Sequence, residues 1–208
     1  MTKKATDRLV WIDCEMTGLD LSRDVLVEVA VVVTESDLTE IDDGVEVVIR
    51  ATPQQLEGMP DVVRDMHTAS GLLEDIPDGV SLAEAEQMVL DYVRSHVPDS
   101  RKAPLAGSSV YVDRGFIARD MKLLDEYLHY RVVDVSSIKE IVRRWYPKVY
   151  FSSPAKHGNH RALADIRESI AELRYYRDAV FVDLPGPTTD DARSMAHAHV
   201  LLPDPVSD

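Results

Sequence analysis

The sequence predicts an α/β fold with a mixed five-stranded sheet, antiparallel over its first three strands and flanked by helices. Three strand-like stretches follow one another closely, at residues 8–16, 24–35 and 44–50. Two shorter ones, at residues 103–109 and 131–135, alternate with helical stretches. Closely spaced strands favour antiparallel pairing, and strands separated by helices favour parallel pairing. We therefore expect both kinds of pairing in one sheet.

The early strands are identified by their hydrophobic patterns. The first, RLVWIDCEM, is apolar at residues 9–12 and then contains two acids. The third, GVEVVIR, alternates between apolar and polar residues. The second, DVLVEVAVVVTE, is almost continuously apolar. Alternation with period two and short apolar runs are both typical of strands.

Helical stretches occupy much of the rest of the chain, at residues 59–71, 81–97, 115–130 and 136–146 and from near Asn159 to residue 181. Gly71 is well placed to end the first of them. Ser81 and Glu84 form an S-x-x-E capping box in the second. Ser137 and Glu140 form another capping box in the fourth.

The composition indicates a folded domain followed by a short extension. Of the 208 residues, 45% are hydrophobic and 29% are charged, which is enough apolar material for a core. The end of the chain is rich in Pro and Asp, a composition typical of a loose segment. We expect one folded domain at residues 1–183 and a C-terminal extension at residues 184–208.

Several features predict a cytoplasmic protein. No apolar run approaches the ~18 residues of a membrane span, so no membrane partner is expected. The start of the chain has basic residues but no apolar segment typical of a signal peptide. Cys14 is the single cysteine, so the chain has no internal disulfide.

The net charge of −14 restricts the possible partners. Proteins that hold long nucleic acids usually carry basic surfaces and gain affinity by releasing counterions. We therefore expect no binding of long nucleic acid, whereas a short and weakly charged one stays open.

Asp13 and Glu15 stand two residues apart in the first strand, so their side chains point to the same face. Trp11 shares that face, while Ile12 and Cys14 face the core. Two carboxylates ~6–7 Å apart along a strand repel each other unless a positive charge lies between them. Two interpretations stay open: both acids face water, or both bind a hard divalent cation.

Further candidate residues lie later in the chain. His160 and Asp165 form an H-x-x-x-x-D pattern at the beginning of the last helix, where Asp165 is at the margin of the buried stripe. Asp113 follows the fourth strand, at the kind of strand-to-helix junction where α/β folds place ligands. Asp113 has the alternative role of a simple helix N-cap, and Asp120 competes with it from a mid-helix position.

Together these patterns resemble the DEDDh family of 3′–5′ exonucleases. D-x-E on the first strand, an Asp after a later strand and H-x-x-x-x-D on the last helix carry the resemblance. The strings WIDCEMTGLD, MHTASGL, HYRVVDVSS, IKEIVRRW and ADIRESIAELRYYR are similar to its oligoribonuclease branch. The resemblance runs from about Leu9 to Phe181. It implies an RNase H-like exonuclease fold and hydrolysis of very short RNA, dinucleotides especially, to 5′-mononucleotides, which completes RNA decay.

The resemblance also implies a two-metal mechanism. Two Mg²⁺ or Mn²⁺ ions ~3.5–4 Å apart would clamp the scissile phosphate. Asp13 would bridge both ions, Glu15 and Asp165 would complete the first site, and Asp113 would serve the second. One ion would lower the pKa of a bound water, and His160 would take its proton, because the pKa of histidine lies near working pH.

Contacts to bases follow from the same resemblance. By position, Leu19 would wedge against a base and His67 would stack on one. Each has a structural alternative, since a leucine is usually a core residue and a helical histidine is usually a surface residue. The partners implied are short RNA oligonucleotides and 5′-phosphorylated dinucleotides.

The string HYRVVDVSS resembles the family segment that binds the 5′ phosphate of the substrate. Arg131 and Ser136 would contact that phosphate and Ser109 would assist. A guanidinium suits this role because its planar fork matches phosphate geometry. Tyr130 would come from the other subunit, so a homodimer is expected.

The chain departs from the family pattern at two places. Ser108 stands where the family often has Asn, and an aromatic residue that some members carry upstream of His67 is absent. These departures bear on substrate contacts and leave the metal ligands intact. Three other functions stay open: a proofreading or DNA-trimming enzyme of the same family, a noncatalytic binding protein, and a phosphatase or nucleotide hydrolase.

Overall fold

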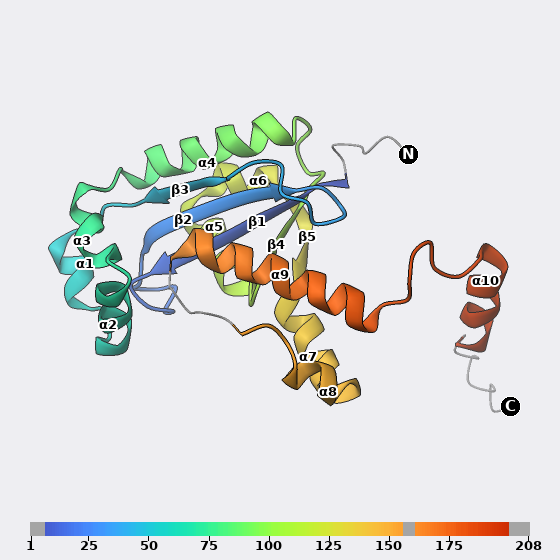
Figure 1. Cartoon of the computed structure of the whole chain (residues 1–208). Coiled ribbons are helices and arrows are strands. Elements are labelled where there is room, and N and C mark those ends of the chain that lie inside the picture. Colours follow the sequence, from blue (N-terminus) through green and yellow to red (C-terminus); the bar gives the residue numbers. More distant parts are fainter. Residues whose placement is uncertain (1–6, 156–160, 200–208) are drawn as a thin grey trace, which may run out of the picture.

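A computed structural model describes residues 7–155 and 161–199 and shows a five-stranded sheet flanked by helices (Figure 1). The strands stand in the order β3-β2-β1-β4-β5. Their bounds are Leu9–Met16 (β1), Leu26–Thr34 (β2), Val45–Val48 (β3), Pro104–Gly107 (β4) and His129–Asp134 (β5). The first three pair antiparallel, whereas β4 is parallel to β1 and to β5. The predicted mixed five-stranded sheet is confirmed.

The middle of the sheet, β1 and β2, is covered on both faces. β2 is buried at every position, as expected of a continuously apolar strand. On one face, Ile12 packs in a core with residues of α4 (Leu82–His96). On the other face, Trp11 packs in a second core with residues of α9 (Ala162–Val180). Figure 1 shows these two helices on opposite faces of the sheet.

The helices in the described part of the chain are short except for α4 and α9. The others are α1 (Pro53–Glu57), α2 (Asp61–Ala69), α3 (Leu72–Asp75), α5 (Tyr111–Asp120), α6 (Lys122–Tyr127), α7 (Val135–Trp145), α8 (Pro147–Phe151) and α10 (Thr189–Ala198), with a 3₁₀ helix at Ile76–Asp78. The capping box predicted for α4 is confirmed. Glu84 donates its backbone N–H to Ser81 Oγ, and the Glu84 carboxylate accepts from the backbone N–H of Ser81 at 2.9 Å.

The single helix predicted at residues 115–130 is wrong in its bounds. α5 begins earlier, at Tyr111, and Met121 separates it from α6 because its backbone leaves the helical region, with φ −122° and ψ 63°. Met121 and Leu124 are both fully buried, so the apolar periodicity continues across the break. A hydrophobic pattern reports buried positions and does not by itself mark such a break.

The capping box predicted at Ser137 and Glu140 is also wrong. The cap of α7 is Asp134, whose carboxylate accepts a hydrogen bond from the backbone N–H of Ser136 at 2.8 Å. Glu140 pairs instead with two arginines of the same helix. Asp is as good an N-cap as Ser. Asp134 comes before Ser137 in the chain, and the helix begins directly after Asp134, at Val135.

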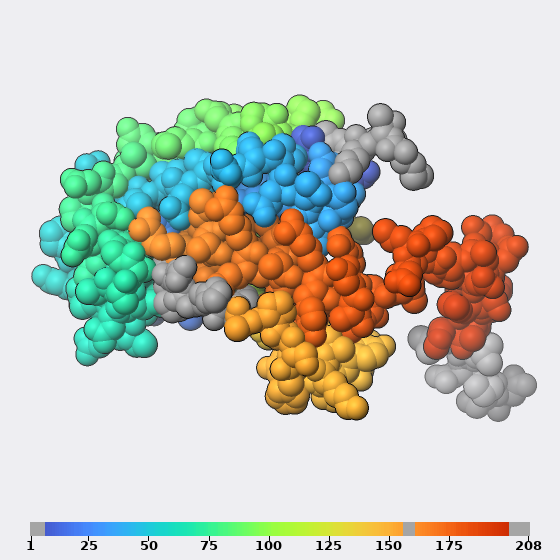
Figure 2. Space-filling view, in the orientation of Figure 1, coloured from blue at the N-terminus to red at the C-terminus, as the bar shows by residue number. Residues whose placement is uncertain are grey.

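The extension predicted at residues 184–208 contains a helix within its described part. α10 follows Thr188, whose hydroxyl accepts a hydrogen bond from the backbone N–H of Asp191 at 3.2 Å. None of its side chains is buried, and Figure 2 shows α10 standing apart from the body of the molecule. The division into a domain and an extension stays a prediction.

Across the described residues, no helix is both long enough and apolar enough to span a membrane.

Candidate active site

The site is built at the carboxyl end of β1, where Asp13 and Glu15 project from one face. Trp11 on the same face is fully buried, and its indole N–H donates to Thr34 Oγ1 at 3.0 Å. Asp13 is half-buried and Glu15 is only 7% exposed. The interpretation in which both acids simply face water is therefore wrong for Glu15.

Asp165 brings a third carboxylate to these two. It lies in the first turn of α9, which packs against β1 and β2. Carboxylate oxygens of Asp13, Glu15 and Asp165 all lie within 4.8 Å of one another. Hard divalent cations prefer such oxygen ligands. The group therefore fits a divalent metal ion, as expected of an exonuclease fold.

The crowding of negative charge affects the protonation of Glu15. Burial raises the pKa of the Glu15 carboxyl to about 8, and the nearby charges of Asp165, Glu28 and Asp113 act in the same direction. Arg161 acts in the opposite direction. A cation bound among these acids would favour the ionised form, because opposite charge lowers the pKa of a carboxyl group.

Asp113 lies beside this group, in the first turn of α5 after β4. Its Oδ1 accepts a hydrogen bond at 2.9 Å from the backbone N–H of Cys14, the residue between the two acids of β1. Burial raises the pKa of the Asp113 carboxyl. The simple N-cap alternative is wrong, because Val110 occupies the cap position of α5.

Two other residues named from the sequence are His160 and Asp120. His160 belongs to residues 156–160, which lie outside the described residues, so its role stays a prediction. Asp120 is the last residue of α5, whereas Asp113 lies in its first turn. The Asp120 carboxylate lies 2.6 Å from the guanidinium of Arg119.

The two residues predicted to contact bases differ in their exposure. Leu19, in the turn after β1, is 72% exposed and so is not a core residue. His67 of α2 is fully buried. Its Nε2 lies 2.9 Å from the carbonyl oxygen of Met16, and its Nδ1 lies 3.8 Å from Glu15 Oε2. The surface alternative for His67 is therefore wrong, and its stacking on a base stays a prediction.

The predicted phosphate segment HYRVVDVSS runs along β5 into the beginning of α7, where Ser136 meets the residues that follow β4. The hydroxyls of Ser108 and Ser109 each lie 3.0 Å from that of Ser136. Asp134 accepts hydrogen bonds from the backbone N–H groups of Ser109 and Ser136, at 3.0 and 2.8 Å. This carboxylate therefore ties the ends of the two strands together and places the three hydroxyls in one cluster.

Tyr130 and Arg131 are exposed on β5, which is one of the two edge strands of the sheet. The Arg131 guanidinium lies over the Tyr130 ring, 5.5 Å from its centre. The structure thus brings Ser109 and Ser136 together, whereas Tyr130 and Arg131 lie on the strand that leads to Ser136.

Sequence reasoning missed Glu28, which is fully buried on β2 directly opposite Glu15. It also missed Arg161, whose guanidinium lies 2.8 Å from the Glu28 carboxylate. The available signal was a single acid inside the apolar run LVEVAVVV, because a charged residue in a buried strand requires a partner.

Solved structures agree with this fold. An exonuclease I structure superposes with a TM-score of 0.64 at 13% identity, over 83% of this chain and 41% of that chain. The exonuclease I of Methylocaldum szegediense gives a TM-score of 0.58 at 17% identity, over 83% of this chain and 41% of that chain. At such identities the likeness concerns the fold alone, which is RNase H-like. The chain spans about two fifths of these larger proteins.

Sequence relatives identify the family. The family model described as Exonuclease matches residues 10–173. The oligoribonuclease of Streptomyces coelicolor is 65% identical over 195 residues, which cover 94% of this chain and 98% of the relative. That of Mycobacterium sp. strain KMS is 60% identical over 191 residues, which cover 91% of this chain and 89% of the relative. With an acidic cluster at the end of β1 and such relatives over nearly its whole length, the chain belongs to the oligoribonuclease family of exonucleases.

Proposed function

We propose that this chain is a 3′–5′ exoribonuclease that hydrolyses very short RNA, dinucleotides especially, to 5′-mononucleotides, and so completes RNA decay. One observation carries the proposal: Asp13, Glu15 and Asp165 gather their carboxylate oxygens within 4.8 Å. These acids stand in a chain that is 65% identical to an oligoribonuclease. The acids supply the chemistry, and the relatives point to the substrate.

The cofactor of this enzyme is two divalent ions, Mg²⁺ or Mn²⁺. Asp13 would contribute to both sites, Glu15 and Asp165 to the first, and Asp113 to the second. When bound, such ions clamp the scissile phosphate and acidify the attacking water. The proximity of Asp113 to the backbone of β1 supports its inclusion, since its Oδ1 is 2.9 Å from Cys14 N.

His160 is the proposed general base. It directly precedes Arg161, the N-cap of the helix that carries Asp165. A histidine there would accept the proton of the attacking water, because its ordinary pKa allows the neutral form at working pH.

The length preference for short RNA is supported by charge. The net charge of −14 repels a long phosphate chain, and each added nucleotide brings another negative charge. We assign the 5′ phosphate of the substrate to Arg131, Ser136 and Ser109. The hydroxyl cluster at the ends of β4 and β5 supports this assignment. Leu19 and His67 would hold the bases.

We further propose a cytoplasmic homodimer in which Tyr130 of one subunit completes the site of the other. The 75% exposure of Tyr130 on an edge strand supports this arrangement, because an edge strand offers unpaired backbone groups to a second chain. The single cysteine agrees with a reducing compartment.

The decisive experiment is a time course on a 5′-phosphorylated dinucleotide (pNpN), with and without EDTA. We expect 5′-mononucleotides to appear with Mg²⁺ or Mn²⁺ and EDTA to stop the reaction. A single-stranded ten-nucleotide DNA and a mononucleotide phosphate ester serve as controls. Faster cleavage of the DNA would indicate a DNA-trimming enzyme, and hydrolysis of the ester alone would indicate a phosphatase.

A further inference from the structure

Glu28 occupies a position that sheet packing alone does not explain. It interrupts the apolar sequence of β2, is fully buried, and pairs across the sheet with Glu15. Like charges directly opposite each other on neighbouring strands destabilise a sheet. A buried charge is also costly unless it is paired and hydrogen-bonded. The partners of Glu28 therefore indicate its role.

Both oxygens of Glu28 meet the beginning of α9. Its Oε2 accepts a hydrogen bond from the backbone N–H of Ala162 at 2.9 Å, and its Oε1 lies 2.8 Å from the Arg161 guanidinium. Glu46 of β3 accepts from the backbone N–H of Leu163 at 3.2 Å. α9 has no side-chain N-cap of its own, and the first N–H groups of a helix lack acceptors within it. Two acids of the sheet supply these acceptors.

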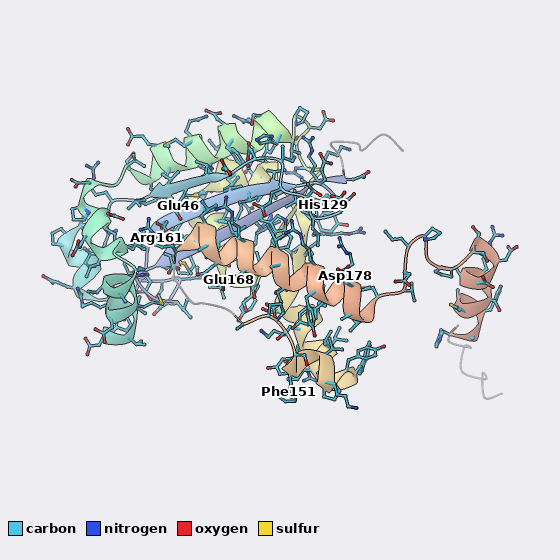
Figure 3. The ribbon with its side chains drawn as sticks, viewed as in Figure 1. Glu46, His129, Phe151, Arg161, Glu168 and Asp178 are labelled. Atoms are coloured by element: carbon cyan, nitrogen blue, oxygen red, sulfur yellow. The ribbon has the colours of Figure 1, made fainter. Side chains whose placement is uncertain are left out.

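Arg161 extends this contact to three parts of the fold. Its guanidinium lies 2.8 Å from Glu28 of β2, 3.5 Å from Glu46 of β3 and 3.1 Å from Asp75 at the end of α3. Figure 3 shows Arg161 and Glu46 together at the beginning of α9. Glu28 is the fully buried member of the three acids, so its pairing with Arg161 is the least screened by solvent.

We propose that Glu28 is a positioning residue of the nuclease site: by holding Arg161 and the Ala162 amide, it fixes the first turn of α9 so that Asp165 meets Asp13 and Glu15. The rest of α9 is held by apolar side chains such as Ile170 and by other ion pairs. Loss of the Glu28 charge therefore displaces the first turn and leaves the helix folded. This inference rests on the proposed function, because it assigns a purpose to the same acids.

The test compares acid-to-amide variants of two acids that contact α9 at different points along its length. Glu28→Gln keeps the side-chain volume and removes the charge that holds Arg161. The matched control is Glu40→Gln, because Glu40 pairs with Arg167 at 3.4 Å and Arg174 at 3.9 Å farther along α9. For Glu28→Gln we expect a loss of about 10–100-fold in Mn²⁺ affinity, the range for groups that orient metal ligands. We expect kcat on pNpN to fall by about 10²-fold, because a 1 Å misplacement has effects of that size, with little change in KM.

A second measurement needs no metal. In hydrogen exchange on the metal-free protein, the amides of Ala162 and Leu163 should exchange faster in Glu28→Gln than in wild type or Glu40→Gln. Arg161→Gln should reproduce the loss of Mn²⁺ affinity. The double variant should be no worse than the more damaged single variant, because both residues act through one contact. Arg161 is partly exposed, so Arg161→Gln decides the question if Glu28→Gln does not fold.

The outcomes separate this inference from the proposed function. If wild type binds Mn²⁺ but does not cleave pNpN, the proposed function fails, and the binding and exchange measurements still test the position of Asp165. A drop in melting temperature with unchanged Mn²⁺ affinity and amide exchange would mean that Glu28 only stabilises the fold. Either that result or additive losses in the double variant would overturn the inference.

Discussion

The acids at the end of β1 and the residues along β5 belong to one proposed site but differ in their surroundings. Glu15 is 7% exposed and Asp113 is 6% exposed, whereas Tyr130 is 75% exposed. The acids are packed between β1, α5 and α9, while β5 has a strand neighbour on one side only. The cation end of the site, formed by Asp13, Glu15, Asp113 and Asp165, is therefore preformed within one chain. The phosphate end, formed by Ser109, Tyr130, Arg131 and Ser136, presents most of its groups at the surface. A variant at each end should therefore fail in a different way.

The largest effect is expected at the cation end. Asp13→Ala should reduce turnover of pNpN by about 10³-fold or more, because it removes a carboxylate shared by both proposed ion sites. Melting of the metal-free variant should occur at the same or a higher temperature, since one of several crowded acids is gone. Asp190→Ala, on the exposed helix α10, is the control and should change neither value. Near-normal turnover of Asp13→Ala in Mg²⁺ would contradict the metal assignment.

At the phosphate end we expect an intermediate effect. Removing the 5′ phosphate from pNpN should cost wild type ~1.5–3 kcal/mol in kcat/KM, the range for a hydrogen bond to a charged group. Arg131→Ala should lose most of this discrimination, because it no longer contacts the phosphate. The measurement is kcat/KM for pNpN, NpN and a ten-nucleotide RNA, with Arg144→Ala of α7 as the exposed-arginine control. Equal wild-type values for the three substrates would indicate a general exonuclease.

A mixing experiment tests whether the phosphate end needs a second subunit. Asp13→Ala and Tyr130→Ala proteins are each expected to be impaired. In a mixed dimer, one site combines wild-type Asp13 with wild-type Tyr130 from the partner. Activity after subunit exchange should therefore exceed that of either variant alone. Full wild-type activity from a species that sedimentation identifies as a monomer would refute the shared site.

A further expected effect concerns pH and the stability of the metal-free protein. Burial raises the pKa of Glu15 from 4.5 to about 8, so the folded state binds this proton more tightly than the unfolded state. Its contribution to stability is fully present below pH 4.5 and is lost as pH rises through about 8. The charged or titratable groups facing Glu15 are Asp13, His67, Asp113, Arg161, Asp165 and Glu28. Melting temperature should fall over this window and should fall less in Glu15→Gln. An identical slope in the variant would assign the effect to the other groups.

The sequence was most informative where local pattern and spacing carry the structure. Alternating and continuous apolar runs predicted the sheet, and D-x-E on a strand placed Asp13 and Glu15 on one face. Their meeting with Asp165 followed from the family resemblance and not from spacing, because a contact between a strand and a distant helix leaves no local pattern.

The errors have physical causes as well. Glu28 was missed because its neighbours are apolar and its partner Arg161 lies on another element. The burial of His67 depends on the fit between α2 and the end of β1, where Met16 supplies a carbonyl oxygen. The helix break at Met121 lies inside an unbroken apolar pattern. Each of these depends on tertiary packing and not on the local sequence.

The hydrogen bond between Asp113 and the Cys14 amide affects which site residues can be lost by mutation when selection for catalysis ends. β4 pairs with β1 only at Val10 and Trp11. Farther along β1, the backbone N–H of Cys14 donates its hydrogen bond to the Asp113 side chain. In a gene copy that is no longer selected for catalysis, Asp13 could be replaced without a loss of stability. Loss of Asp113 leaves a buried amide without its acceptor, which costs about 1–3 kcal/mol of stability. A retained Asp113 in an inactive descendant would thus record selection for a folded chain, and its presence alone would not be evidence of a working nuclease.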